Sequence, residues 1–381
     1  MIIGKVPECE YVLVRDRREL LNRALNLGRR IHRPFGRTDF FAQTNYFTLN
    51  LKKYPELDLI HTFSRVCLDR NNRWVVTIEK NIPAHFCDEF SLNKKLIRKQ
   101  AGLMASDLCV AMLPISQWAY DYQIWLLSQA ASPEQIEVIR SKMQVLLPPQ
   151  PVICGEDEVI EKHWHIESEP LRFLFVGSQL QRKGGLEVLK AFDELSTRLP
   201  QFRLDFVGNP ENAVVNFYLT NEEKNYIASL RGKSPWLHFY EKLPNDQVVQ
   251  LARQAHVGLL PSFGDTFGFS VLEMQACGCP VVTTNRMALP EINSDECGWL
   301  LDSKKVQLLH GDDYASYSRK EIAELSDTIH TELVQTLEEI IAHPEAIRKK
   351  ALCARERVSE QHSPEAYASK LKEIYLSGKR T

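Results

Sequence analysis

Residues 261–285 read PSFGDTFGFSVLEMQACGCPVVTTN and contain the strongest indication of the fold. An apolar run ends at Pro261, a glycine-bearing turn follows, and a helical pattern extends from near Phe267 or Gly268 to Gly278. Another apolar run then begins at once. A strand, a turn and a helix in this order are typical of parallel α/β sheets, where the helix N-terminus lies above the carboxyl end of the strand. Free N–H groups and the helix dipole suit this position to a phosphate.

Comparable apolar runs occur along the whole chain, each bounded by polar or turn residues. Those before residue 152 lie at 11–14, 57–63, 73–79, 108–114 and 144–149, and those after residue 170 lie at 171–177, 202–208, 236–240, 257–263, 280–284 and 298–302. Near-continuous apolar runs that alternate with helical patterns are typical of parallel strands buried on both faces. The two series predict an α/β protein with two doubly wound, Rossmann-like domains.

A charged segment separates the two series. Residues 152–170 read VICGEDEVIEKHWHIESEP and end in proline, which predicts a linker. We therefore expect a first domain at 1–151, a second domain at 171–362 and a C-terminal helix at about 363–381. Capping residues and prolines indicate helix boundaries at Ser132 with Pro133, Asn245, Ser318, Pro344 and Pro364.

The composition is that of a folded globular protein. Of 381 residues, 44% are hydrophobic and 25% charged, which excludes collagen-like and largely disordered chains. The net charge of −2 gives no general field for a nucleic acid, so no nucleic-acid partner is predicted. No apolar stretch reaches the length of a signal peptide or a spanning helix, which indicates a cytoplasmic protein. The nine cysteines are scattered without a C-x-x-C, which predicts reduced, buried thiols.

Two acidic residues in the 261–285 segment are candidates for a site. Asp265 lies in the turn and Glu273 follows eight residues later, about two helical turns along, so both carboxylates can face one crevice. One of them would meet a sugar and the other a ribose. The alternative is a solvated Asp at a turn and a Glu on an exposed helix face. Glu273 lies between Leu272 and Met274, however, and a carboxylate in a largely apolar helix needs a partner.

This segment resembles the signature of the glycosyltransferases of family four, retaining enzymes of GT-B fold, which reads P-S-x-x-E-G-F-G-x-x-x-L-E. Asp265 stands where the family has its first Glu and Thr266 where it has Gly, while the residues that match are Phe267, Gly268, Leu272 and Glu273. The resemblance continues through 278–282 and 288–292. It implies that Asp265 lies beside the transferred sugar and that Glu273 binds the ribose diol. It also implies that sugar and phosphate are bound along the backbone of Thr266, Phe267, Gly268 and Phe269.

A second motif, FVGSQLQRKGG at 175–185, combines a strand end at Gly177 with two basic residues and two glycines before a helix. Adjacent cations and closely approaching backbone can hold a diphosphate without a metal. The loop resembles the family's G-R-L-x-x-x-K-G, with Lys183 and Gly184 as its Lys and Gly. Ser178 replaces the usual Arg, and Arg182 is our candidate for the missing cation. The alternative is a surface loop with glycines at a helix start.

Weaker matches extend the resemblance. Residues 237–262 resemble the stretch that wraps the nucleotide base, so Leu243 and Pro244 border the base or simply pack in a loop. In the first half, Glu79 occupies the strand end where many members carry a His. It orients the sugar, contacts the acceptor, or does neither. His163 and His165 form an H-x-H without an identifiable third ligand, so no metal site is predicted.

Together these patterns predict a retaining, hexosyltransferase-type enzyme in glycan or surface-polysaccharide biosynthesis. It would move a sugar from a nucleotide diphosphate sugar to an acceptor hydroxyl without a cofactor or metal. Asp265, Lys183 and Arg182 are the predicted catalytic residues. The alternatives are a nucleotide-sugar epimerase or phosphorylase of the same fold, and an inactive sugar-nucleotide-binding partner. By the resemblance, the final helix, residues 362–376, returns to the first domain.

The first half also carries local positive charge. Residues 15–37 contain eight arginines against two acids, a net charge of +6, interleaved with apolar residues at near-helical spacing. A second cluster comprises Lys94, Lys95, Arg98 and Lys99. Such segments are typical of attraction to an anionic bilayer, although a solvated helix face has the same composition. We therefore expect a glycan or lipid-linked acceptor and peripheral contact with the inner face of a membrane.

Overall fold

The computed structural model describes residues 6, 9–12, 46–47, 57–68, 70–83, 94–164, 166–199, 202–214, 216–308 and 313–378. The chain divides into two compact units. Unit 1 comprises Met1–Pro149 and Pro364–Thr381, and unit 2 comprises Gln150–Ser363. The predicted α/β class with parallel sheets is found in both units.

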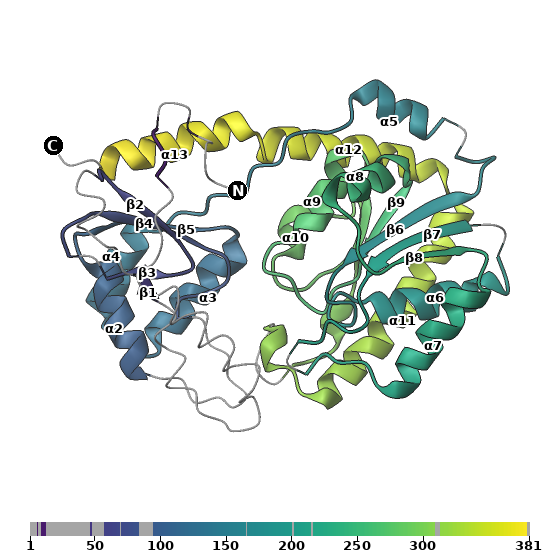
Figure 1. Ribbon diagram of the computed structural model, residues 1–381, viewed down its shortest axis with the longest axis horizontal. Helices are drawn as coiled ribbons and strands as arrows, with labels where there is room; N and C mark the ends of the chain where they lie inside the picture. The colour runs from purple at the N-terminus through teal and green to yellow at the C-terminus, as the bar shows by residue number, and fades with distance from the viewer. Residues whose placement is uncertain are drawn as a thin grey trace. The chain divides into compact units, whose positions relative to one another are not determined.

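Unit 2 is built on a parallel sheet whose six described strands follow the order β11-β10-β9-β6-β7-β8 (Figure 1). Their bounds are β6 Leu171–Gly177, β7 Phe202–Gly208, β8 Leu237–Tyr240, β9 Val257–Leu260, β10 Val281–Thr284 and β11 Trp299–Leu301. Each strand lies inside one of the apolar runs predicted after residue 170. The reversal of strand order at β6 and β9 brings two neighbouring strand ends to the same edge, where doubly wound sheets bind their ligands.

Helices cover both faces of this sheet (Figure 1). They are α5 Glu156–Lys162, α6 Gly185–Ser196, α7 Asn221–Lys233, α8 Asn245–Gln254, α9 Phe269–Ala276, α10 Leu289–Ile292, α11 Arg319–Ala342 and α12 Glu345–Gln361. One core joins Phe173 and Phe175 of β6 to α6 and α11, while α8, α9 and α12 pack together on the other face. Ser318 caps α11 through a capping box with Glu321, as its sequence indicates.

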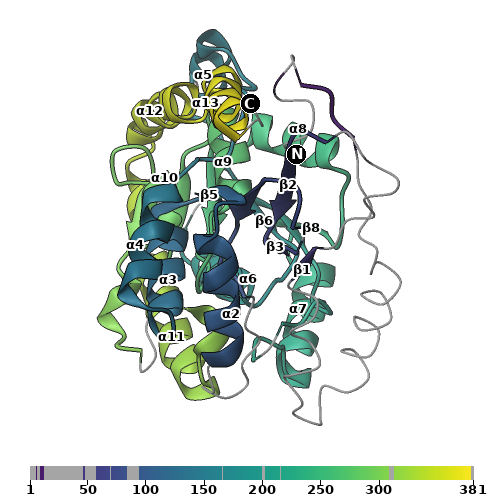
Figure 2. The ribbon, with the colours of Figure 1, turned by 90° about the vertical axis from the view of Figure 1, so that its left-hand side faces the viewer.

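Unit 1 is built on a smaller parallel sheet of order β2-β4-β5 in the part of the chain that the structure describes. Its elements are β1 Tyr46–Phe47, β2 Ile60–Phe63, β3 Val66–Cys67, β4 Trp74–Ile78, β5 Cys109–Pro114, α2 Lys94–Ala105, α3 Gln117–Ser128, α4 Pro133–Lys142 and α13 Pro364–Gly378. Ser132 caps α4 with Pro133 in its first turn, as predicted. Helices α2, α3 and α4 pack against one another (Figure 2).

Alternate side chains of β4 point to opposite faces of this sheet, and helices cover both faces. Trp74, Val76 and Ile78 share a core with α2, α3 and α4, whereas Val75 shares a core with Leu371 of α13. The final helix therefore belongs to unit 1, although unit 2 directly precedes it in the chain.

A half-buried histidine, His61, joins α13 to the strands. The Tyr375 hydroxyl lies 2.6 Å from His61 Nδ1, and His61 Nε2 lies 2.8 Å from Thr77 Oγ1. Burial lowers the pKa of His61 to about 4, so the ring is neutral near pH 7. A neutral ring has one acceptor and one donor nitrogen, which matches these two hydroxyl partners.

Several sequence-based expectations differ from the structure. Residues 144–149 do not form a strand, because the run ends in two prolines; Gln144 and Leu146 nevertheless donate backbone hydrogen bonds to β5. The expected linker contains α5, whose Val159 is fully buried, and the segment belongs to unit 2. Of the run at 11–14, Tyr11 and Val12 are not in a strand and the rest lies outside the described residues.

Cys297 and Cys353 form a disulfide, so the expectation that all nine cysteines are reduced thiols is wrong. The two residues are 56 positions apart, and their spacing carries no pairing signal. The basic segment 15–37 lies outside the described residues. Within the described chain, no helix combines the length and the apolar character that a bilayer span requires.

Candidate active site

Two loops predicted to carry chemistry meet at the carboxyl edge of the unit 2 sheet. Loop 178–184 follows β6 and loop 261–268 follows β9, and these strands are hydrogen-bonded neighbours. The Arg182 carbonyl accepts hydrogen bonds from the Phe263 N–H at 3.0 Å and the Ser262 hydroxyl at 3.2 Å. The two motifs, about 80 residues apart in sequence, therefore form one local structure.

An ion pair between Lys183 and Asp265 links the side chains of these loops. Both side chains are largely buried, with exposed fractions of 15% and 10%. Burial raises the pKa of Asp265, but the charges of Lys183 and Arg182 outweigh it, and the pKa lies below its ordinary value. Asp265 is therefore a charged carboxylate near pH 7. A buried ion pair at a strand end is a site where an incoming anion can compete for the cation.

Arg182 connects the loops in another way. Its Nη1 donates to the Gly264 carbonyl at 2.6 Å and its Nε to Gln179 Oε1 at 2.5 Å. The guanidinium lies 4.5 Å from the centroid of the Tyr314 ring, which is a cation–π distance. Arg182 thus holds the backbone beside Asp265 and adds positive charge to its surroundings.

Two glycines give the site its backbone geometry. Gly184 caps α6 with φ +77°, and a Cβ there would overlap the carbonyl oxygen of Pro261. Gly268 caps α9 with φ +94°, and its Cβ would lie 2.9 Å from Ile292 and 3.0 Å from Leu289. A side chain at either position would meet both a steric barrier and left-handed backbone strain. Gly184 therefore permits the close approach of the two loops, and Gly268 permits the close approach of the turn before α9 to α10.

Helix α9 begins immediately after this turn, as the sequence predicts. The first N–H groups of a helix lack partners within the helix and carry partial positive charge, so they suit a phosphate. Thr266 and Phe267 are buried in the preceding turn, whereas Phe269 in the first turn of α9 is 50% exposed. The Phe267 and Phe269 rings lie 5.0 Å apart.

Glu273 lies further along α9, next to the start of α8. Asn245 Nδ2 lies 3.4 Å from Glu273 Oε1, and Asn245 directly follows Leu243 and Pro244. Burial raises the pKa of Glu273, while the Asn245 contact opposes the rise. The structure therefore brings Glu273 and the expected base-binding segment together. A half-buried carboxylate with one weak amide partner can accept further hydrogen bonds, such as those of a ribose diol.

The remaining predicted residues lie at strand ends. Gly177 ends β6 and pairs with Gly208 of β7. Glu79 follows β4 in unit 1, is exposed, and its N–H donates to Ser64 Oγ at 3.3 Å.

His163 is buried and its Nδ1 hydrogen-bonds the Val159 carbonyl, while His165 lies outside the described residues. Among the described residues, no three His, Cys, Asp or Glu side chains are arranged to hold a metal.

Sequence reasoning missed Gln179, Tyr314 and Asn245 as parts of the site. Gln179 lies within the 175–185 motif, but the prediction for that motif used only its basic residues and glycines. Tyr314 belongs to a short 3-10 helix, Tyr314–Ser316, about 130 residues after Arg182, and no local pattern connects the two. The Asp265 carbonyl likewise accepts a hydrogen bond from the Ala288 N–H at 3.1 Å. Ala288 lies in residues 288–292, for which the sequence showed only a resemblance to the family and no contact with Asp265.

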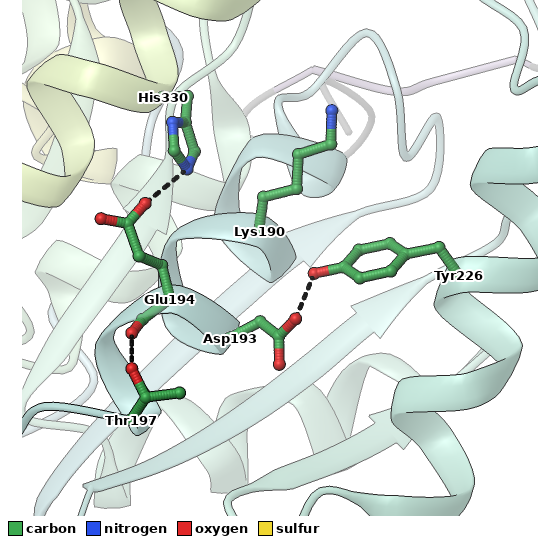
Figure 3. Close-up of a pocket in the computed structure, with 6 residues that line it drawn as sticks. All are labelled: Lys190, Asp193, Glu194, Thr197, Tyr226 and His330. Atoms are coloured by element: carbon green, nitrogen blue, oxygen red, sulfur yellow. Dashed lines mark hydrogen bonds and ion pairs between the residues drawn. The ribbon is translucent and has the colours of Figure 1, made fainter.

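A concave pocket of about 490 Å³ lies between α6, α7 and α11 and contains none of the predicted site residues (Figure 3). Its lining comprises Lys190, Asp193, Glu194, Thr197, Tyr226 and His330. The Tyr226 hydroxyl donates to Asp193 Oδ2 at 2.9 Å. Lys190, Asp193 and Glu194 lie in the middle and C-terminal part of α6, whereas Lys183 and Gly184 precede its N-terminus at the carboxyl edge of the sheet.

Comparison with known proteins relates this site to an enzyme family. The family described as Glycosyl transferases group 1 matches residues 156–312, which include both loops, α9 and Glu273. The D-inositol 3-phosphate glycosyltransferase of Corynebacterium jeikeium is 33% identical over 154 residues, which is 39% of this chain and 36% of that protein. The comparisons support the glycosyltransferase superfamily. The chain thus spans only about a third of the length of this curated relative.

Solved structures extend the comparison to both units. Sucrose-phosphate synthase from Thermosynechococcus elongatus has a TM-score of 0.56 and 15% identity, covering 97% of this chain and 81% of that one. Anabaena HepE in complex with UDP and glucose has a TM-score of 0.53 and 15% identity, covering 86% and 80%. These neighbours are GT-B glycosyltransferases, so the predicted GT-B class is confirmed.

Replacing Gly184 with Ala should lower the free energy of unfolding by about 1–3 kcal/mol, because the new Cβ meets the Pro261 carbonyl at positive φ. The matched control is Gly232→Ala in α7, where a Cβ meets no atom within 4 Å. That change should instead raise stability by up to about 1 kcal/mol through helix propensity. Urea unfolding of the two variants measures both effects. Equal stability of Gly184→Ala and wild type would contradict the close approach of the loops.

Proposed function

We propose that this protein transfers a sugar from a nucleotide diphosphate sugar to an acceptor hydroxyl, with retention of the anomeric configuration. The observation that carries the proposal is the buried Lys183–Asp265 pair next to the N-terminus of α9. The site offers a cation and free N–H donors for a diphosphate, and a carboxylate for sugar hydroxyls. Retention rests on the resemblance to family-four enzymes.

Lys183 is the proposed ligand of the leaving diphosphate. In the described structure its charge is balanced by Asp265, and a diphosphate brings a larger negative charge to the same cation. Exchange of partners would free Asp265 to accept hydrogen bonds from the sugar. The Arg182 side chain already donates hydrogen bonds to Gly264 and Gln179, which hold the two loops together. Its proposed role is therefore to add positive charge near the diphosphate without binding it directly. Fixed positive charge of this kind stabilises the charge that develops on the leaving group.

The nucleoside is proposed to lie between α9 and the start of α8. Glu273 would accept hydrogen bonds from the ribose diol, and Leu243, which is half-buried, would border the base. Uridine diphosphate is the first nucleotide to examine, since HepE, of the same fold class, is described in complex with UDP and glucose. Guanosine and adenosine diphosphates are the necessary comparisons.

The first test of the proposed function concerns Asp265. Replacement with Asn should lower donor turnover about 100-fold or more, because the charge next to the sugar is lost. UDP affinity should be unchanged or higher, because Lys183 loses its competing partner. Asp265→Glu, which restores the charge, should recover part of the activity, and Asp327→Asn on the exposed face of α11 should have no effect. Donor hydrolysis and calorimetric UDP titration measure the two quantities.

The result also separates the alternatives for the whole protein. Nucleotide binding without any release of sugar, in wild type as in Asp265→Asn, would indicate a binding partner that has lost catalysis. Interconversion of the donor sugar without an acceptor would indicate an epimerase. Equal losses of UDP affinity and turnover in Asp265→Asn would contradict the role given to this carboxylate.

Glu273→Gln should weaken UDP binding by about 1–3 kcal/mol, roughly 5- to 150-fold, through loss of a charge-assisted hydrogen bond to the ribose. Binding of inorganic diphosphate should not change, because Glu273 would contact only the nucleoside. Glu324→Gln, on the exposed face of α11, is the matched control. Calorimetric titration with UDP and with diphosphate provides the comparison, and an unaltered UDP affinity would remove Glu273 from the site.

The acceptor is proposed to be lipid-linked or a surface polymer. Lys94, Lys95 and Arg98 are exposed along α2 of unit 1, where they form a basic helix face. Exposed cations on one face attract an anionic bilayer at short range. No other part of the proposed function depends on this assignment.

Co-sedimentation with phosphatidylserine vesicles should show binding at low salt that weakens as the salt concentration rises, because the attraction is screened. Pure phosphatidylcholine vesicles should bind little. Replacing Lys94, Lys95 and Arg98 with Gln should reduce binding to the anionic vesicles by up to roughly 150-fold, at about 1 kcal/mol for each of the three basic residues. Absence of binding at low salt would leave a soluble acceptor as the better proposal.

A further inference from the structure

A buried carboxyl group lies where α6 packs against α11 in unit 2. Glu187, in the first turn of α6, is only 1% exposed. The Ser326 hydroxyl of α11 donates a hydrogen bond to Glu187 Oε1 at 2.5 Å. Glu187 Oε2 is closed off from solvent and has no hydrogen-bond partner among the described residues. One of the two carboxyl oxygens is therefore buried without a partner.

A single hydrogen bond is too little for a buried carboxylate. An ionised carboxylate has about four acceptor positions, and burying it without donors or a cation costs far more than burying the neutral acid. Asp265 in the same unit is also buried, but it forms an ion pair with Lys183. The hydrogen-bond partner of Glu187 is instead a neutral hydroxyl. We therefore expect Glu187 to keep a proton under conditions in which Asp265 has lost its own.

The charged groups near Glu187 do not offset its burial. Burial raises the pKa of Glu187 from 4.5 to about 7, against the smaller effects of the Ser326 hydrogen bond, the Glu187 N–H and Lys190. Lys190 lies three residues along α6 from Glu187. Glu223 of α7 adds a further small rise through repulsion. Charge and burial together thus favour the protonated form.

The other elements that pack against α6 provide no additional cation near pH 7. On α11, His330 lies one turn after Ser326, and its Nε2 is 3.6 Å from Glu194 Oε2 (Figure 3). Burial lowers the pKa of His330, so its ring is neutral near pH 7. Strand β6 packs against α6 with apolar side chains such as Phe173. Ionisation of Glu187 would therefore place a poorly balanced charge between two packed helices.

We propose that Glu187 is a neutral carboxylic acid in acidic solution and that its ionisation near neutral pH weakens the packing of α6 on α11. The proton leaves the Glu187 carboxyl for solvent, and no other bond changes. Helix α6 begins at Gly184, directly after Lys183, so its packing supports one of the two loops of the candidate site. The inference does not rest on the proposed sugar transfer, because it depends only on the buried carboxyl and its neighbours.

The raised pKa sets the direction of the pH dependence. Above pH 4.5 the unfolded chain has released the Glu187 proton, whereas the folded chain holds it up to about pH 7. Unfolding therefore releases a proton in this range, and stability falls as the pH rises. The loss begins near pH 4.5 and is complete above about pH 7. Through this one group, the folding equilibrium constant should fall roughly 50-fold or more between pH 5 and pH 8.

Glu187→Gln tests this dependence, because the amide keeps an acceptor for Ser326 but cannot ionise. Urea unfolding of the full chain, followed by hydrogen exchange and mass spectrometry on peptides of α6 and α11, measures the stability of unit 2. The ratio of the folding constants of wild type and Glu187→Gln should fall roughly 50-fold between pH 5 and pH 8. Glu222→Gln, at an exposed position in the first turn of α7, is the matched control and should give a constant ratio. A pH-independent ratio for Glu187→Gln would overturn the proposal.

Infrared difference spectra of the folded protein detect the proton directly. Wild type should show the C=O band of a protonated carboxyl near pH 6 and lose it by about pH 8. Ser326→Ala, which removes the donor to the carboxylate, should move this loss to higher pH. The pKa of Glu273 is also raised, and spectra of Glu273→Gln separate its contribution. Absence of the band from wild type near pH 6 would overturn the proposal, even if Glu187→Gln folded poorly.

Discussion

Lys183 and Asp265 carry opposite charges into the interior of unit 2, at the point where two neighbouring parallel strands end. Removing a charge from water is costly, and each side chain offsets that cost for the other. Arg182 adds a second positive charge and binds the carbonyl of Gly264, directly before Asp265. The turn before α9 therefore has one arrangement that keeps all three charges satisfied, and the free N–H groups of α9 are positioned by that arrangement.

The sheet topology makes this interaction possible. Lys183 follows β6 and Asp265 follows β9, and only the pairing of these two strands brings the loops within reach. Gly184 then permits an approach to the Pro261 carbonyl that any side chain would prevent. The strand order thus brings the two loops together, Gly184 lets them approach closely, and this approach allows Lys183 and Asp265 to form their ion pair. The nucleotide side of the site depends on a further contact, between α8 and α9, which brings Asn245 to Glu273.

Helix α9 has a different chemistry at each end. Its first turn offers N–H donors beside the Lys183–Asp265 pair, while the carbonyl of its C-cap residue, Cys277, accepts a 2.9 Å hydrogen bond from Lys162 Nζ. A cation therefore lies at each end of this eight-residue helix. The α5 segment, which the sequence suggests is a linker, supplies Lys162 to the second of these. Burial of Val159 explains why this charged segment packs as part of unit 2.

The local features of this protein were determined by its sequence. Apolar runs located every strand of unit 2, Ser132 and Ser318 located helix starts, and the 261–285 and 175–185 motifs located Lys183, Asp265 and Glu273, because hydrophobic period, capping and turn chemistry act over a few residues. The tertiary structure alone decided that Tyr314 covers Arg182, that Asn245 meets Glu273 and that Cys297 pairs with Cys353. Those contacts join residues far apart in sequence, so they depend on strand order and helix packing, which no local pattern encodes.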